Sequence, residues 1–178
     1  MGSYRAAALA LAAVLNAPTA LAQEAGWRYS PLPGEGDRAS MGCARGSTAE
    51  DFTCLVVRCE DDLSTGLHIH ASRPGGNTGI WEMTLDRETR QLPAVEGPAP
   101  YGARLADPHG WLLDGLRHGT FIYLRHAGDE GAAFAFIDLA GSYHAIAEAL
   151  YWCAPRTGPD EQIDGSGVVT MENNGEAQ

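Results

Sequence analysis

Residues 52–59 read FTCLVVRC, and this β-branched and aliphatic run decides how we expect the chain to fold. Side chains alternate between the two faces of a strand, so Cys54 and Cys59 should point to opposite sides. Cys59 shares its face with Leu55 and Val57, which form the more apolar side. The run therefore predicts a strand that buries Cys59.

The last helix expected from the sequence carries the natural partner of that cysteine. Ser142 is a candidate N-cap, and Ile146, Leu150 and Cys153 recur at helical spacing on one face. A Cys59–Cys153 disulfide would tie this helix to the sheet.

The remaining cysteines, Cys43 and Cys54, would form a local disulfide across the first hairpin. Four cysteines allow three pairings, and the sequence leaves the other two open. Zinc binding is the alternative, but Cys54-x4-Cys59 is a poor zinc spacing and a strand would separate the two thiols. The disulfides are the favoured interpretation.

Further strand-like runs occupy residues 66–73, 79–85, 101–105, 120–125 and 132–139. The turn at 74–77 suits an antiparallel hairpin between the first two of them, and residues 93–100 read as a proline-punctuated loop. A short helix should begin after an Asp107 N-cap and end at Gly119. Together these patterns predict a mainly β (β-rich α+β) chain: a single antiparallel, β-sandwich-like domain with two helices, the second tethered by a disulfide at its C-terminus.

The ends of the chain differ from its centre. Residues 1–22 have the pattern of a secretory signal peptide, with Arg5, an apolar run over 6–15 and an Ala-Leu-Ala cleavage site. Residues 23–37 read as an extended lead-in, 38–155 as the β-rich domain and 156–178 as a disordered acidic tail. These features predict a periplasmic or secreted protein, in a compartment where disulfides persist.

The charge narrows the range of partners. The formal net charge is −11, and all 12 basic residues are arginine. Nucleic acid and anionic lipid both require clustered cations, so neither is expected as a partner. No segment has the length of a membrane span. A cationic protein partner suits this acidic chain.

His68-x-His70 is the one arrangement with metal-site geometry, because alternate residues of a strand project on the same face. The alternative is a solvated outer face, since the residues flanking each histidine form the apolar side of that strand. A third ligand would come from the remaining histidines, which are His109, His118, His126 and His144.

No catalytic signature is present, and no cofactor motif is recognised. The sequence Gly141-Ser142-Tyr143-His144 lacks the second glycine of a nucleophile elbow. Acidic pairs such as Asp61-Asp62 and Asp129-Glu130 fall in expected turns and read as solvated charges. Trp81 and Trp111 are expected in the core, whereas Trp27, in the polar lead-in, is a candidate for partner contact.

The C-terminal half has a further pattern: residues 112–119 (LLDGLRHG) lead into the strand at 120–125, and 136–142 (FIDLAGS) enter the helix that ends at Cys153. Over residues 52–154 this order of motifs resembles the pattern of small exported bacterial β-proteins, including the invasion-associated locus B family and the VasI-like accessory proteins of type VI secretion. The resemblance implies a β-rich exported domain without established catalysis.

The leading hypothesis is therefore an exported, non-enzymatic binding or envelope-interaction protein. The alternative is an exported metal-binding protein or metalloenzyme that uses His68 and His70.

Overall fold

The computed structural model describes residues 25–30, 38–97, 101–129 and 131–154. The predicted signal peptide, most of the lead-in and the predicted acidic tail lie outside these ranges. The elements are β1 Gly26–Tyr29, β2 Ala39–Cys43, β3 Thr53–Cys59, β4 Thr65–Ala71, β5 Gly79–Leu85, β6 Glu88–Glu96, β7 Ala103–Leu105, α1 Trp111–His118, β8 Phe121–His126, β9 Ala135–Asp138, α2 Ser142–Leu150 and a 3-10 turn, η1, Tyr151–Cys153.

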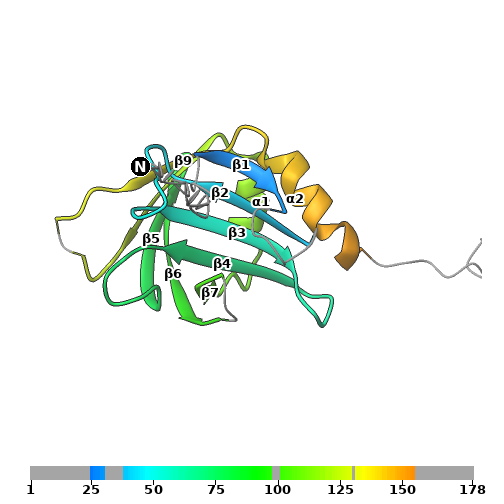
Figure 1. The fold of residues 1–178 in the computed structure, drawn as a ribbon, viewed down its shortest axis with the longest axis horizontal. Helices are drawn as coiled ribbons and strands as arrows, with labels where there is room; N and C mark the ends of the chain where they lie inside the picture. Colours follow the sequence, from blue (N-terminus) through cyan, green and yellow to red (C-terminus); the bar gives the residue numbers. More distant parts are fainter. Residues whose placement is uncertain (1–24, 31–37, 98–100, 130, 155–178) are drawn as a thin grey trace, which may run out of the picture.

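Within these described ranges all the strands belong to one antiparallel sheet of nine strands, in the order β1-β2-β3-β4-β7-β6-β5-β8-β9. The sheet folds back on itself, so that β9 comes to lie beside β1 and β2 (Figure 1). The amide of Arg45 donates to the carbonyl of Phe136 at 2.8 Å across this junction. The two halves of the sheet enclose the core between them, and the prediction of an antiparallel β-rich domain with two helices is confirmed.

The expected boundary of the compact part at Arg38 is too late, because β1 already pairs with β2 from Gly26 onward. The hairpin expected between Cys43 and Cys54 is formed by β2 and β3, although no bounds were predicted for β2. The strand β6 occupies part of the segment 93–100 that was expected to be a loop. Pro93 is tolerated inside β6 because its carbonyl accepts from the amide of Ala106, on the side where β7 ends. In a strand the amide and the carbonyl of one residue point to the same side, so the missing amide of Pro93 removes a hydrogen-bond donor only on this side, and the pairing with β5 is unaffected.

The expected hairpin between 66–73 and 79–85 does not form. β4 pairs with β3 and β7, whereas β5 pairs with β6 and β8. The three-residue β7 lies between the two halves and takes the edge of β4 that β5 would have used. A turn sequence therefore marked the chain reversal correctly but could not specify which strands become neighbours.

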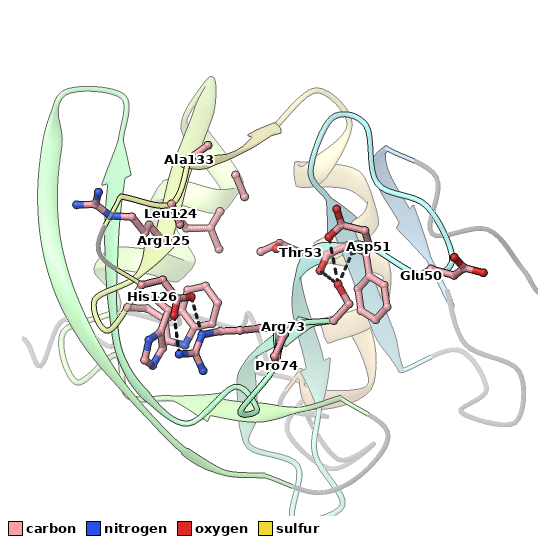
Figure 2. A pocket seen from close by; sticks show the side chains of 15 residues that line it. Glu50, Asp51, Thr53, Arg73, Pro74, Leu124, Arg125, His126 and Ala133 are labelled. Carbon is pink, nitrogen blue, oxygen red and sulfur yellow. Dashed lines mark hydrogen bonds and ion pairs between the residues drawn. The ribbon is translucent and has the colours of Figure 1, made fainter.

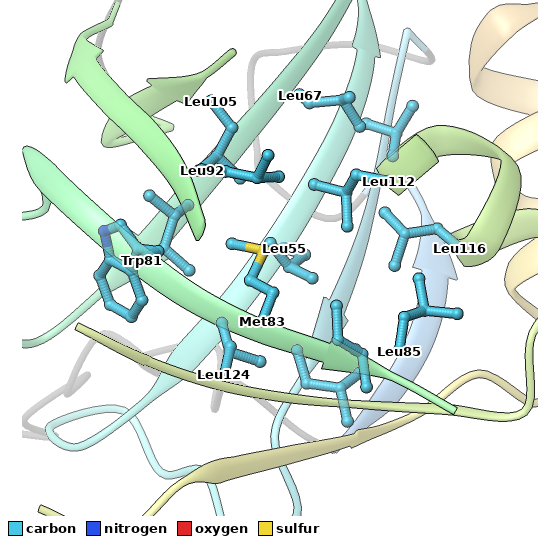
Figure 3. Close-up of a cluster of buried hydrophobic side chains, with 14 of the residues drawn as sticks. Leu55, Leu67, Trp81, Met83, Leu85, Leu92, Leu105, Leu112, Leu116 and Leu124 are labelled. Atoms are coloured by element: carbon cyan, nitrogen blue, oxygen red, sulfur yellow. The ribbon is translucent and has the colours of Figure 1, made fainter. Parts of the chain in front are cut away.

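A large apolar cluster fills the space inside the folded sheet (Figure 3). Leu55 and Met83, from opposite halves, are among its fully buried members, and Trp81 is 3% exposed. Burying one such side chain contributes about 1.5–3 kcal/mol. A second, smaller cluster lies on the other face of β2 and β3 and is completed by Tyr101.

The helix α1 covers one end of this core. Its Leu112 and Leu116 are fully buried, and Gly115 lies so close to Leu85 that a Cβ there would overlap the leucine. The predicted start of the helix needs correction, because the N-cap is Gly110. Asp107 nonetheless accepts from the amide of Leu113 at 3.0 Å, so its carboxylate still satisfies a first-turn donor.

The helix α2 packs against β1, β2, β3 and α1 (Figure 1). Ile146 on its inner face is fully buried. Its N-cap is Gly141 rather than the predicted Ser142, whose hydroxyl instead donates to the carbonyl of Leu139 at 2.7 Å. In the described part of the chain, neither helix has the length and hydropathy to cross a membrane.

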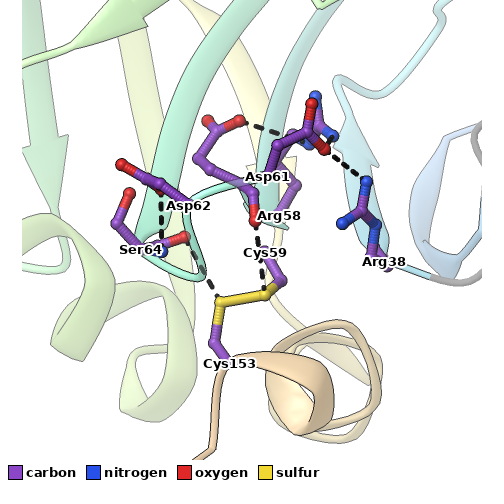
Figure 4. Close-up of a disulfide and its surroundings, with 8 residues drawn as sticks. Arg38, Arg58, Cys59, Asp61, Asp62, Ser64 and Cys153 are labelled. Carbon is purple, nitrogen blue, oxygen red and sulfur yellow. Dashed lines mark hydrogen bonds and ion pairs between the residues drawn. A yellow bond between two sulfur atoms is a disulfide. The ribbon is translucent and has the colours of Figure 1, made fainter.

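Both disulfides expected from the strand faces are present. Cys59–Cys153 joins β3 to the turn that follows α2 (Figure 4), and Cys43–Cys54 links two residues directly opposite in the β2–β3 ladder. All the cysteines are thereby oxidised. The first disulfide fixes the end of α2 on the sheet, as predicted.

Candidate functional site

The end of the sheet opposite α1 opens into a cavity of about 420 Å³, which we call the mouth (Figure 2). Along β5, Leu85 contacts α1 whereas Trp81 lines the mouth, so the two ends are separated by the length of this strand. The mouth is formed by the β2–β3 loop, the segment after β4 and the β8–β9 loop, together with the strand residues below them. Cavities at the ends of closed or nearly closed sheets are common places for small ligands.

The residues at the base of the mouth are apolar or small. Trp81 and Leu124 line it and also belong to the large core cluster, while Thr53, Ala133 and Ala135 contribute small side chains. The indole nitrogen of Trp81 donates to the carbonyl of Asn77 at 2.8 Å, which fixes the plane of the ring. Trp81 is only 3% exposed and Leu124 is fully buried, so a ligand in the mouth would mainly meet Ala133 and Ala135, above this rigid base.

An ion pair crosses the rim of the mouth. The Arg73 guanidinium donates to both carboxylate oxygens of Asp129, at 2.6 and 2.7 Å. These hydrogen bonds lower the pKa of Asp129 and raise that of Arg73. The pair ties the β8–β9 loop to the segment after β4, so the prediction that Asp129 is simply a solvated charge is wrong.

Arg125, the second arginine of the mouth, is neutralised as well. It donates to Glu82 at 2.8 Å, and its guanidinium lies 4.2 Å from the centre of the Phe134 ring. Neither arginine of the mouth is therefore left to attract an anionic ligand.

His126 is the one histidine in the mouth, and its ring nitrogens are both engaged. Nδ1 accepts from the amide of Gly128, and Nε2 lies 3.0 Å from the carbonyl of Thr78, to which it can only donate. These contacts assign the neutral Nε2–H tautomer. The imidazole holds two turns in place and keeps no lone pair for abstracting a proton.

Two carboxylates at the rim, unlike Asp129 and Glu82, are not paired with an arginine of the mouth. Asp51 accepts from the Ser72 hydroxyl at 3.3 Å, and Glu50 lies at the outer edge of the mouth (Figure 2). Both side chains are exposed, and neither forms an ion pair with another described residue. With both arginines neutralised, the rim carries an excess of negative charge.

The structure places the predicted metal-site histidines elsewhere, on the outer face of β4. His68 is completely buried and His70 is half-buried against Phe52, so the alternative of a solvated outer face is wrong for His68. Nε2 of His68 lies 2.7 Å from Oε1 of Glu60. Within the described residues no group of three histidine, cysteine or acidic side chains is arranged to hold a metal ion, and the metal site stays a prediction.

Glu60 anchors a buried polar cluster around His68. Its carboxylate reaches over Gly66, where a Cβ would collide with Oε1, and lies 3.5 Å from Nε of Arg58. Arg58 in turn stacks over Tyr101 at 5.1 Å, and the ring of His68 lies 5.9 Å from the same tyrosine. The cluster is enclosed by protein, which indicates a structural role.

Burial lowers the pKa of His68, and the hydrogen bond to Glu60 only partly offsets that effect. The nearby positive charges of Arg104 and Arg58 act in the same direction as burial. Burial also lowers the pKa of His70. Both imidazoles are therefore held neutral at pH 7.

Trp27 lies on β1 and is half-buried. Its indole packs against the core cluster and rests directly on Gly42, where a Cβ would overlap the ring. Gly42 is thus required for the close approach of the ring to β2. Much of this side chain serves packing, and its predicted contact with a partner stays a prediction.

Sequence reasoning missed the mouth. The expectation that Trp81 lies in the core is confirmed, but its place at the base of a cavity was not predicted. Arg73 carried no signal, because its partner Asp129 lies 56 residues away in another turn. Only the chain reversals at both positions were visible in the sequence. Comparisons with family models, curated proteins and solved structures find no match for this chain.

Proposed function

We propose that the protein is an extracytoplasmic, non-enzymatic binding protein that receives a positively charged side chain of a protein partner in its mouth. One observation carries the proposal: the cavity has an apolar base and two neutralised arginines, while Asp51 and Glu50 at its rim lack an ion pair among the described residues. An arginine or lysine side chain would lay its aliphatic stem against Ala133 and Ala135, above the buried ring of Trp81, and present its charge to the rim.

The charge of the whole molecule supports the same class of partner. A net charge of −11 raises the local concentration of cations and speeds their approach. The engaged nitrogens of His126 support a binding role over an acid–base role for the mouth.

The test is calorimetric titration with a tetra-arginine peptide at low salt, with tetra-citrulline as a neutral control of similar shape. The double variant Glu50→Gln/Asp51→Asn should bind the cationic peptide about three- to tenfold more weakly, as expected for the loss of two partly exposed charge contacts. Wild-type protein should not bind tetra-citrulline measurably.

A matched variant separates the mouth from bulk charge. Glu96→Gln/Asp114→Asn removes the same charge from exposed positions outside the mouth and should leave the affinity within about twofold of wild type. Equal losses in both double variants would exclude the mouth as the site. Failure of the wild type to bind tetra-arginine at all would overturn the proposal itself.

A further inference from the structure

A second cavity of about 420 Å³ lies between β1 and the outer face of α2, and we call it the aromatic groove. It is lined by Tyr29, His144, Ala147, Glu148, Tyr151 and Trp152. His144, Ala147 and Glu148 follow one another at helical spacing on α2, and Tyr151, the first residue of η1, continues the same stripe. The groove shares no lining residue with the mouth.

The backbone that carries two of the aromatic side chains is restrained by a disulfide outside the groove. Tyr151 and Trp152 belong to η1, whose last residue, Cys153, is bonded to Cys59 on β3. Their rings lie 5.8 Å apart and nearly perpendicular. Because the disulfide restricts this turn, little conformational freedom would be lost when a ligand binds.

Tyr151 is left outside the core although it is large and aromatic. It is 69% exposed, more than Tyr143 of α2 at 45%. Its ring therefore contributes little to the packing of α2, and it remains accessible from solvent. An exposed ring beside the half-buried Tyr29 and Trp152 provides aromatic surface on more than one side of the groove.

The charge of the groove complements a cation. Glu148 is exposed and forms no ion pair with another described residue. Aromatic faces carry a negative quadrupole and attract cations, most strongly those that are weakly hydrated. A primary ammonium would need several hydrogen-bond acceptors, whereas a quaternary ammonium needs none.

We propose that the aromatic groove binds a small, soluble quaternary ammonium compound, with Glu148 supplying the counter-charge and Tyr29, Tyr151 and Trp152 the aromatic walls. This site is independent of the proposed function of the mouth, because the two cavities have no residue in common. The inference rests on the shape, aromatic lining and charge of this groove alone.

The direct test is calorimetric titration or ligand-observed NMR of the whole protein with choline and tetramethylammonium. The matched control ligand is 3,3-dimethylbutan-1-ol, which has the shape of choline without its charge, and it should bind about tenfold more weakly. Equal binding of choline and the alcohol would show an apolar groove only and overturn the proposal, as would no binding of either cation.

Variants locate the site. Tyr151→Leu, which keeps apolar area but removes the aromatic face, and Glu148→Gln should each weaken choline binding about three- to tenfold. Tyr143→Leu is the matched control, at an exposed position of α2 that does not line the groove, and should leave binding unchanged. Equal losses in Tyr143→Leu and Tyr151→Leu would place the site elsewhere.

Two further experiments separate this proposal from the proposal for the mouth and from binding to lipid. Glu50→Gln/Asp51→Asn, which tests the mouth, should not change choline binding, so failure of one proposal is distinguishable from failure of the other. Cosedimentation with phosphatidylcholine vesicles, without binding of free choline, would contradict a soluble ligand and assign the groove to a lipid headgroup.

Discussion

His68 is fully enclosed, although it lies on a strand face that also carries the half-buried His70. Two side chains occupy the space that solvent would otherwise fill. One is Tyr101, which is distant from His68 in the sequence, and the other is Glu60, which lies outside β4. A neutral imidazole donates one hydrogen bond to Glu60, and protonation would add a charge that burial opposes. Its environment thus makes this side chain a source of pH-dependent stability.

We predict that the free energy of unfolding falls as the pH drops below about 6.5, the pKa of histidine in an unfolded chain. The folded-state pKa of His68 is lowered, mainly by burial, so between the two values the unfolded chain binds more protons. His68→Gln keeps a donor for Glu60 but cannot titrate, and should reduce the slope. One group accounts for at most about 1.4 kcal/mol per pH unit.

Urea unfolding followed by tryptophan fluorescence between pH 7.5 and 5 measures this slope. His70 contributes in the same direction, so part of the dependence should persist in the variant. His109→Gln, at an exposed position before α1, is the control. A His68→Gln protein with the full wild-type slope would show that this imidazole is not held neutral.

Among the elements, α2 depends most on a covalent bond for its position. Its inner face packs against three strands, but the turn after it is joined to β3 through Cys59–Cys153. An ion-pair network lies beside the disulfide, where Asp61 accepts from Arg38 at 2.5 Å and lies 3.7 Å from Arg58 (Figure 4). Removing the bond would leave an apolar helix face with weaker attachment.

Cys153→Ser should destabilise the domain by about 2–5 kcal/mol. The bond closes a loop of sequence separation 94, whereas Cys43–Cys54 spans only 11. Chain entropy alone then gives about 4.7 kcal/mol for the longer loop and about 2.8 kcal/mol for the shorter. Chemical unfolding of Cys153→Ser and Cys43→Ser compares the two.

Limited proteolysis provides a second measurement, since α2 should become accessible in Cys153→Ser and stay protected in Cys43→Ser. The paired variants Cys59→Ser/Cys153→Ser and Cys43→Ser/Cys54→Ser remove the free thiol that each single substitution leaves. A larger loss of stability from the short bridge would mean that loop length does not govern the effect here.

The whole molecule has two unlike ends, because α1 covers one end of the folded sheet and the mouth occupies the other. The mouth is set in a chain of net charge −11, whose field extends further than any single contact. At this scale the charge governs how quickly a cationic partner arrives, and the rim governs how long it stays.

We therefore predict that the association rate of the tetra-arginine peptide falls at least about tenfold between 10 and 500 mM salt, because screening shortens the range of the field. Stopped-flow fluorescence measures it. Glu50→Gln/Asp51→Asn should mainly raise the dissociation rate and retain most of the salt dependence. An association rate that is independent of salt would contradict steering by the net charge.

The sequence by itself determined the features that follow from local periodicity. The alternation over residues 53–59 assigned Cys59 and Cys54 to opposite faces, and the helical spacing of Ile146 and Cys153 identified the partner, so both disulfides could be predicted. The antiparallel β-rich class and most strand positions followed in the same way.

Only the tertiary structure decided which strands pair and which side chains meet. The turn after β4 is compatible with a hairpin, and it was the insertion of β7 that gave β4 another neighbour. Arg73 meets Asp129, and Tyr29 meets the face of α2, through contacts between residues far apart in the chain. Such contacts leave no periodic trace in a single sequence, because their geometry arises only when the sheet folds back around its core.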